Sequence, residues 1–234
     1  MKSIVFSHKG KREVNQDYVL VHDISFDTRI YLIADGMGGY DHGEIAAKMV
    51  AENILTYLST VEKIDETQIQ KAINKSNLAI RQLREKKITK VGSTVGGVII
   101  QGNRATCFWV GDVKIFHFRN NKLVFESQAH TLMNELISNG SIKDPKQINK
   151  YKHVVTRSVQ GDIEHSQIGS FTQENIDKSD FFLVCSDGVH DLYDGMLIQQ
   201  LFNSSPSIKE AISVIEERLV KEAKDNFSLI TISE

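Results

Sequence analysis

Apolar residues in the first third of the chain are grouped in short runs, and charged or turn-forming residues end each run. Runs of this kind, rich in valine, isoleucine, leucine and aromatic residues, are typical of β-strands. We therefore expect strands at residues 3–7, 18–22 and 29–34.

The spacing of apolar residues then changes and becomes that of two helices. Residues 44–58 are rich in alanine and have a helical pattern. A second helix is expected to begin at Asp65, whose carboxylate can cap it while the Gln68 side chain reaches back from the third helical position. Ile69 and Ile73 then begin an apolar stripe on one face of this helix.

The rest of the pattern predicts a second group of strands, a short helix and a final segment of strands around a longer helix. The Asn120–Asn121 pair between two of the strands indicates a hairpin turn. Ser207 and Glu210 predict a capping box at the start of the longer helix. The expected strands are at residues 93–100, 105–110, 113–119, 123–125, 167–171, 181–185 and 229–232, and the helices are at 131–138 and 207–224.

This order of elements predicts a layered α+β fold. Blocks of strands separated by paired helices, with short spacings between strands, favour antiparallel pairing over alternating β-α-β units. A length of 234 residues, of which 41% are apolar, fits one large domain, so we expect a single domain at residues 1–234. Residues 127–154 are polar and less regular, and we expect them to form a flap on this domain.

Composition and charge exclude several classes of protein. With 28 basic and 30 acidic residues the net charge is −2, so nothing points to a nucleic acid or an anionic membrane as partner. No apolar run approaches the roughly 18 residues of a membrane span, and the one near the amino terminus is too short for a signal peptide. Cys107 and Cys185 lie in apolar runs, where cysteine is usually a small buried hydrophobe. We expect a cytoplasmic protein without a disulfide framework.

The segment DGMGG at residues 35–39 follows an apolar strand and allows three interpretations. A nucleotide-binding loop would place backbone N–H groups against phosphates, but the glycine spacing is wrong and no Lys-Ser/Thr pair follows. A structural turn would use the glycines for positive φ and Asp35 for bonds to nearby amides. A metal site would use the aspartate as a hard oxygen ligand beside closely approaching backbone. The motif alone leaves the turn and the metal site open.

Three further aspartates stand at the ends of predicted strands. Asp187 follows the apolar run at residues 181–185, and Asp112 follows the run at 105–110. Asp225 stands between the last helix and the last strand. Carboxylates brought together repel one another unless divalent cations neutralise them. The recurrence at four strand boundaries therefore favours a metal cluster over isolated turns.

Six short motifs occur in the order and spacing of one known family. They are NQD at residues 15–17 behind Arg12, DGMGG at 35–39, GST at 92–94, VGD at 110–112, SDG at 186–188 and DN at 225–226. With these motifs the sequence resembles the metal-dependent type 2C serine/threonine protein phosphatases over essentially the whole chain. It looks like one of the compact bacterial members.

The resemblance implies a fold and a metal site. The family fold is a sandwich of two antiparallel β-sheets flanked by helix pairs, with two Mg²⁺ or Mn²⁺ ions in a cleft at one end. By motif position, Asp35 would bridge the two ions and the carbonyl of Gly36 would contact one of them. Asp187 and Asp225 would hold the other ion. Asp112, with Asp187, matches the ligands of a third, weaker metal site.

The resemblance also implies roles for two residues near the amino terminus. Arg12 occupies the place of the arginine that binds the substrate phosphate, and a guanidinium suits bidentate phosphate binding. Asp17 matches the carboxylate that hydrogen-bonds metal-bound water. A water that bridges two metals has a lowered pKa and attacks phosphorus directly. Neither cysteine has an arginine six positions later and Asp35 is not part of Asp-x-Asp, so covalent phosphatase mechanisms are poorly supported.

The chain departs from the family pattern beside DGMGG and beside VGD. Many relatives have a histidine directly after DGMGG, assigned to protonating the leaving alkoxide, whereas this chain has Tyr40. His42 stands two positions later, and a histidine near neutral pKa is suited to donate that proton. We keep both Tyr40 and His42 as candidates. Val113 and Lys114 replace the usual Ser-Arg after VGD, so bonding around Asp112 is expected to differ.

The sequence thus predicts a cytoplasmic, metal-dependent enzyme of bacterial signalling that hydrolyses phosphoserine and phosphothreonine in proteins. The expected partners are phosphorylated protein substrates and a cognate serine/threonine kinase, and the expected state is a monomer. Two alternatives stay open, a phosphatase-like binding module without turnover and a hydrolase of small phosphate esters. The motifs define the metal site but not the rim that selects the substrate.

Overall fold

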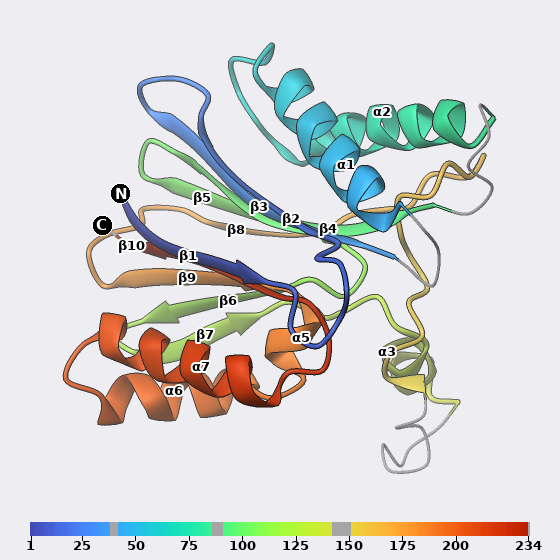
Figure 1. Ribbon diagram of the computed structural model, residues 1–234. Coiled ribbons are helices and arrows are strands. Elements are labelled where there is room, and N and C mark those ends of the chain that lie inside the picture. Colours follow the sequence, from blue (N-terminus) through green and yellow to red (C-terminus); the bar gives the residue numbers. More distant parts are fainter. Residues whose placement is uncertain (38–41, 86–90, 142–150, 234) are drawn as a thin grey trace.

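Two five-stranded β-sheets pack face to face (Figure 1). The computed structural model describes residues 1–37, 42–85, 91–141 and 151–233. One sheet has the strand order β1-β10-β9-β6-β7 and the other the order β2-β3-β4-β5-β8, and all neighbouring strands are antiparallel. The strands are β1 (Lys2–His8), β2 (Asp17–Asp23), β3 (Thr28–Gly36), β4 (Ser93–Gln101), β5 (Arg104–Val110), β6 (Lys114–Arg119), β7 (Lys122–Glu126), β8 (Gly169–Gln173), β9 (Asp180–Cys185) and β10 (Phe227–Ser233).

A pair of long helices covers the outer face of each sheet, which gives four layers (Figure 1). Helices α1 and α2 pack on the sheet that contains β3, whereas α6 and α7 pack on the sheet that contains β9, with the short α5 at one end. The helices are α1 (Gly43–Leu58), α2 (Glu66–Glu85), α3 (Leu132–Ser138), α5 (Asp187–His190), α6 (Gly195–Ser204) and α7 (Ile208–Glu222).

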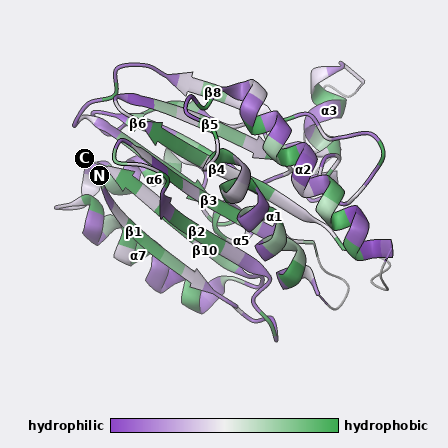
Figure 2. Ribbon diagram, turned by 90° about the horizontal axis from the view of Figure 1, so that it is seen from above, coloured by the Kyte–Doolittle hydropathy of each residue, from purple (hydrophilic) through white to green (hydrophobic). Residues whose placement is uncertain are grey.

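Buried apolar side chains fill the spaces between these layers. Between the sheets, Ile33 and Trp109 of one sheet belong to the same cluster as Ile115 and Val184 of the other. All of β4 except its last residue is buried, because one face meets the helices and the other meets the second sheet. Figure 2 shows the resulting hydrophobic residues along the strands and hydrophilic residues on the outer helix faces.

The architecture confirms the predicted α+β class and the sandwich of two antiparallel sheets. Every predicted strand is present, with ends that differ by one or two residues. Asn120 and Asn121 have φ values of 51° and 59°, as the predicted hairpin turn requires. Cys107 and Cys185 are buried free thiols, as expected. None of the helices in the described parts of the chain is long and apolar enough to cross a membrane.

Three details of the sequence-based expectation are wrong. The pattern did not predict α5 or α6, although Asp194 caps α6 by accepting a hydrogen bond from the Leu197 N–H at 2.8 Å. At the start of α2, Asp65 accepts from the Gln68 N–H at 3.0 Å as expected. The Gln68 side chain does not reach back, because it accepts from the hydroxyl of Tyr57 on α1 at 2.7 Å and so joins the two helices.

The segment predicted as a flap contains α3 in its described part, and residues 142–150 lie outside the described residues. Thr131, the N-cap of α3, pairs with Val155 in an isolated antiparallel bridge. The Leu132 N–H donates to the carbonyl of Val154 at 2.8 Å. The two ends of the segment are therefore hydrogen-bonded to each other.

Candidate active site

Asp17 and Asp35 meet where β2 and β3 pair. Asp17 is the first residue of β2 and Asp35 is the last but one of β3, and the antiparallel register makes them direct partners. Asp17 is only 8% exposed, and its Oδ2 accepts a hydrogen bond from the Ser186 hydroxyl at 2.7 Å. Its Oδ1 is buried without a hydrogen-bond partner among the described residues. A buried acceptor of this kind is expected to face a cation or water.

Asp187 and Asp225 reach the same end of the sandwich from the other sheet. Asp187 is the first residue of α5 and follows the end of β9 after one residue. Asp225 comes two residues before β10, which is the neighbour of β9 in the sheet. Because these two strands are antiparallel, the end of β9 and the start of β10 lie at one edge. The strand ends identified from the sequence therefore converge.

Asn226 fastens the amino-terminal loop to this edge. Its Nδ2 donates to the carbonyls of Lys9 and Val14, both at 2.9 Å. Its Oδ1 accepts from the Gln16 N–H, also at 2.9 Å. The Gln16 carbonyl in turn accepts from the Gly36 N–H at 3.0 Å, so one amide side chain connects the loop, β3 and the start of β10. In the sequence Asn226 is recognisable only as part of the DN motif at residues 225–226, and no local pattern indicates this role.

Arg12 is held at the mouth of the carboxylate cluster by this loop. Its Nη2 donates to Asp225 Oδ2 at 2.6 Å, and about half of its side chain is exposed. The hydrogen bond to Asp225, followed by the charge of the same carboxylate, raises the pKa of Arg12. The arginine predicted to bind phosphate is thus paired with an aspartate predicted to bind metal.

Two partly buried histidines hold the backbone around Asp112. The His130 N–H donates to the carbonyl of Gly111 at 2.8 Å, and the Gly111 N–H donates back to His130 Nδ1 at 3.2 Å. Gly111 has a φ of 101°, which favours glycine. On the other side, His190 Nε2 donates to the Asp112 carbonyl at 2.9 Å. Burial lowers the pKa of both histidines to about 4, so both are neutral at neutral pH.

Glycines follow two of the aspartates because backbone from another element approaches there. A Cβ at Gly36 would lie 2.2 Å from the carbonyl oxygen of Gly43 at the start of α1. A Cβ at Gly188 would lie 2.1 Å from the carbonyl oxygen of Asn226. Each Asp-Gly step is therefore required by close packing as well as by the turn.

The aspartates strongly perturb one another. Burial, followed by the charges of Asp17, Asp187, Asp112 and Asp225, raises the pKa of Asp35 well above its ordinary value. Burial raises the pKa of Asp187 to about 8 and that of Asp17 to about 6, with the neighbouring aspartates adding to both. Protein groups alone do not compensate the negative charge, so the cluster favours bound protons or cations.

Four of these aspartates, all but Asp17, line a cavity of about 350 Å³. In the part of the chain that the structure describes, no three acidic, histidine or cysteine side chains converge closely enough to hold one ion unaided. Mg²⁺ commonly uses only one or two carboxylates and fills its shell with water and substrate phosphate, so the residues fit divalent cations. The lining residues are Arg12, Gln16, Asp35, Gly36, Met37, Thr94, Asp112, His153, Val155, Asp187, Asp225 and Asn226.

The residues that could protonate the leaving alkoxide differ in their position relative to the cavity. Tyr40 lies outside the described residues. His42 is exposed at the N-cap of α1 with a φ of 94°, and it is not among the described residues that line the cavity. His153 lines it instead, although no regular metal-ligand spacing in the sequence identifies this residue.

In a comparison with known protein families, one family matches almost the whole chain. Residues 6–225 match the family described as protein phosphatase 2C. The chain is 25% identical to a putative protein phosphatase of Mycoplasma pneumoniae, with 97% of this chain and 93% of the relative covered. It is 27% identical to the serine/threonine phosphatase stp of Listeria monocytogenes, with 87% and 83% covered.

The fold is also similar to that of solved structures of bacterial phosphatases. The serine/threonine phosphatase PstP/Ppp of Mycobacterium tuberculosis has a TM-score of 0.82 at 23% identity, with 98% of this chain and 97% of that chain covered. A structure of the PstP catalytic domain in complex with two manganese ions has a TM-score of 0.80 at 23% identity, with 98% and 96% covered.

Proposed function

The chain belongs to the protein phosphatase 2C family, and we propose that it hydrolyses phosphoserine and phosphothreonine in proteins with the help of two divalent cations, Mn²⁺ or Mg²⁺. Protein phosphatase activity follows from the family. The preference for serine and threonine is supported by the similarity to the Listeria relative, which is named a serine/threonine phosphatase. The use of cations is supported by the manganese complex of PstP.

The residues that would hold the cations are those that line the carboxylate cavity. We assign Asp35 and the Gly36 carbonyl to a first ion, and Asp187 and Asp225 to a second, with water and substrate phosphate filling the rest of each shell. Asp112 is the candidate for a third, weaker site. When bound, two cations would lower the pKa of a water between them and neutralise charge on the phosphoryl oxygens.

Arg12 in the cavity and Asp17 beside Asp35 would bind the substrate phosphate and place the water. Arg12 would form charge-assisted hydrogen bonds with the phosphoryl oxygens, and its exposure at the mouth makes it accessible to a phosphorylated residue. Asp17 is fixed by the Ser186 hydroxyl through Oδ2, which leaves Oδ1 as an acceptor for a water in the cleft. His42 and Tyr40 stay candidates for protonating the leaving alkoxide, and His153 joins them.

The observation that carries this proposal is the meeting of four strand-end aspartates, Gly36 and Arg12 in one cavity. It is tested by phosphate release from phosphoserine, phosphothreonine and phosphotyrosine peptides with Mn²⁺, with Mg²⁺ and with EDTA. We expect metal-dependent turnover of the first two peptides. Metal-independent turnover, or hydrolysis of none of the peptides, would contradict the proposal.

The setting of the enzyme is also part of the proposal. We propose a single catalytic domain that acts as a monomer in the cytoplasm, opposite a serine/threonine kinase that phosphorylates the same proteins. A net charge of −2 offers no general attraction to nucleic acid or to an anionic membrane.

A further inference from the structure

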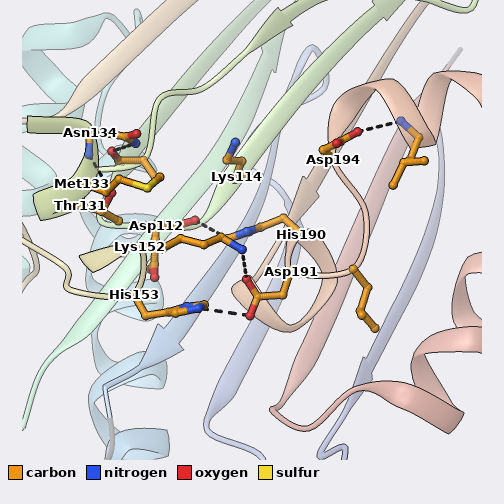
Figure 3. Close-up of a pocket in the computed structure, with 13 residues that line it drawn as sticks. Asp112, Lys114, Thr131, Met133, Asn134, Lys152, His153, His190, Asp191 and Asp194 are labelled. Atoms are coloured by element: carbon orange, nitrogen blue, oxygen red, sulfur yellow. Dashed lines mark hydrogen bonds and ion pairs between the residues drawn. The ribbon is translucent and has the colours of Figure 1, made fainter. Parts of the chain in front are cut away.

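A second cavity, of about 300 Å³, adjoins the carboxylate cleft. Figure 3 shows the residues that line this second cavity. Asp112 and His153 line both cavities, so a substrate held at the cleft would lie at the entrance of the second one. This second cavity lies between the α3 segment and the residues that join α5 to α6. Its volume is at the lower end of the range for ligand pockets, which suits one side chain better than a whole cofactor.

The walls of the second cavity offer apolar surface from both sides. Ala129 and Met133 contribute from the α3 side, and Leu192 and Leu197 contribute from the α6 side. Ala129 is buried, whereas Leu197 is 42% exposed, so the apolar surface extends from the interior to the opening. Such a surface suits an aliphatic chain.

The positive charges of the second cavity are already paired. Lys152 Nζ donates to Asp191 Oδ1 at 2.8 Å, as Figure 3 shows. Lys114 Nζ donates to Glu126 Oε1. Neither lysine therefore offers an uncompensated positive charge to an incoming group.

Asp194 supplies negative charge at the opening. Its Oδ1 accepts from the Leu197 N–H at 2.8 Å as the cap of α6, and its Oδ2 has no hydrogen-bond or ion-pair partner in the described parts of the chain. The residue is exposed. A cavity with apolar walls, paired lysines and an acidic opening is complementary to a side chain that has an aliphatic stem and a cationic end.

We propose that this cavity binds the side chain of a lysine or arginine that flanks the phosphorylated residue in the protein substrate. The aliphatic stem lies between Met133 and Leu197, and the cationic end interacts with Asp194. The proposal rests on the proposed function, because it selects among phosphorylated protein segments. It names a sequence preference of the enzyme, which the cation-binding residues do not determine.

The test uses phosphothreonine peptides that carry arginine, norleucine or glutamate at each flanking position in turn. We expect the wild type to have the highest kcat/KM for arginine and the lowest for glutamate at one position. Asp194→Asn retains the cap, because asparagine caps as well as aspartate, but it removes the charge. We expect it to abolish the preference for arginine over norleucine, a change of about threefold to fivefold, as for an exposed ion pair.

Two more variants separate the cation from the stem. Asp65→Asn is the matched control, since it makes the same change at the cap of α2 outside both cavities, and it should keep the preference. Met133→Ala should lower kcat/KM for the arginine and norleucine peptides alike. The proposal is overturned if the wild type has no arginine preference at any flanking position, if Asp194→Asn retains it, or if Met133→Ala changes neither peptide.

A small ester keeps this test independent of the proposed function. p-Nitrophenyl phosphate has no flanking residue, so all three variants should hydrolyse it at the wild-type rate. A wild type that hydrolyses the ester but does not discriminate among the peptides contradicts the side-chain pocket alone. A wild type that hydrolyses neither contradicts the phosphatase proposal itself.

Discussion

Asp17 faces Asp35 directly across the β2–β3 pair, whereas at the other end of the same pair Asp23 faces Arg29. Like charges placed opposite each other destabilise a sheet, and opposite charges stabilise it. The Asp17–Asp35 pair, at the end of the two strands beside the carboxylate cavity, is therefore expected to destabilise the folded protein when no cation is bound. The protein retains this arrangement where the chemistry requires negative charge.

We expect Asp17→Asn to stabilise the cation-free protein by about 1 kcal/mol, because it relieves a carboxyl pair that must either repel or bind a proton against its ordinary pKa. The same variant should lose most of its phosphatase activity. Chemical denaturation in EDTA measures the first effect, and peptide hydrolysis measures the second. Asp23→Asn is the control, since it breaks a favourable pair with Arg29 and should not stabilise the protein. A destabilised Asp17→Asn protein in EDTA would refute the repulsion.

The ion pair between Arg12 and Asp225 predicts competition between the arginine and a cation. Arg12→Ala should raise the KM for a phosphopeptide about tenfold, as expected for loss of a charge-assisted hydrogen bond at an exposed site. It should also leave Asp225 free for metal, so Mn²⁺ should bind up to about fivefold more tightly, the range of an exposed pair. Calorimetric titration with Mn²⁺ measures this. Arg218→Ala, which removes an arginine on α7, is the control. Weaker Mn²⁺ binding by Arg12→Ala would show that the pair supports the metal site.

His117 predicts the pH dependence of stability. Its Nε2 lies 2.6 Å from Asp180 Oδ1, and its Nδ1 is buried without a partner among the described residues. Burial lowers the pKa of His117 despite the nearby carboxylate. Between this lowered pKa and the ordinary value of about 6.5, the unfolded chain binds more protons than the folded protein. The contribution of His117 to stability is therefore full above pH ~6.5 and is lost as the pH falls below it.

The variant His117→Phe should remove this contribution. We expect its free energy of unfolding to change less than that of the wild type between about pH 6.5 and 5. Denaturant titrations at several pH values measure the slope, and replacement of the exposed His22 by phenylalanine is the control. Identical slopes in the wild type and His117→Phe would exclude His117 as the cause.

The residues that line the carboxylate cavity predict which histidine protonates the leaving alkoxide. His153 lines the carboxylate cavity and His42 does not, so His153→Gln should lower kcat for a phosphothreonine peptide more than His42→Gln does. General acid catalysis is worth about 10²-fold or more, and it matters least for a good leaving group. The kcat of His153→Gln for p-nitrophenyl phosphate, which has a good leaving group, should therefore change little. A larger loss in His42→Gln would return the role to the histidine that the motif suggested.

The strand-end aspartates could be predicted because each depends on a local pattern. Asp35 and Asp187 follow apolar strands and precede glycines, and this signal is contained in a few neighbouring residues. The hairpin at Asn120–Asn121 is local in the same way. The start of α6 was missed because Gly195 is an unfavourable helix residue, and only the Asp194 cap reveals it.

Other parts of the site depend on contacts between distant segments. The Asn226 side chain binds backbone more than 200 residues away in the sequence, and no local spacing encodes that contact. His153 lines the cavity only because the segment around α3 returns to the core at Val155. The pairing of Arg12 with Asp225 is equally nonlocal. Such features require the folded structure.

The central claim is that the carboxylate cluster holds the cations that enable hydrolysis. Its most direct test compares the wild type with Asp35→Asn in two measurements, calorimetric titration with Mn²⁺ and phosphate release from a phosphothreonine peptide. We predict that the wild type binds Mn²⁺ and turns over only when it is present, and that Asp35→Asn loses both properties while staying folded. If Asp35→Asn retains Mn²⁺-dependent turnover, the cluster is not the catalytic metal site.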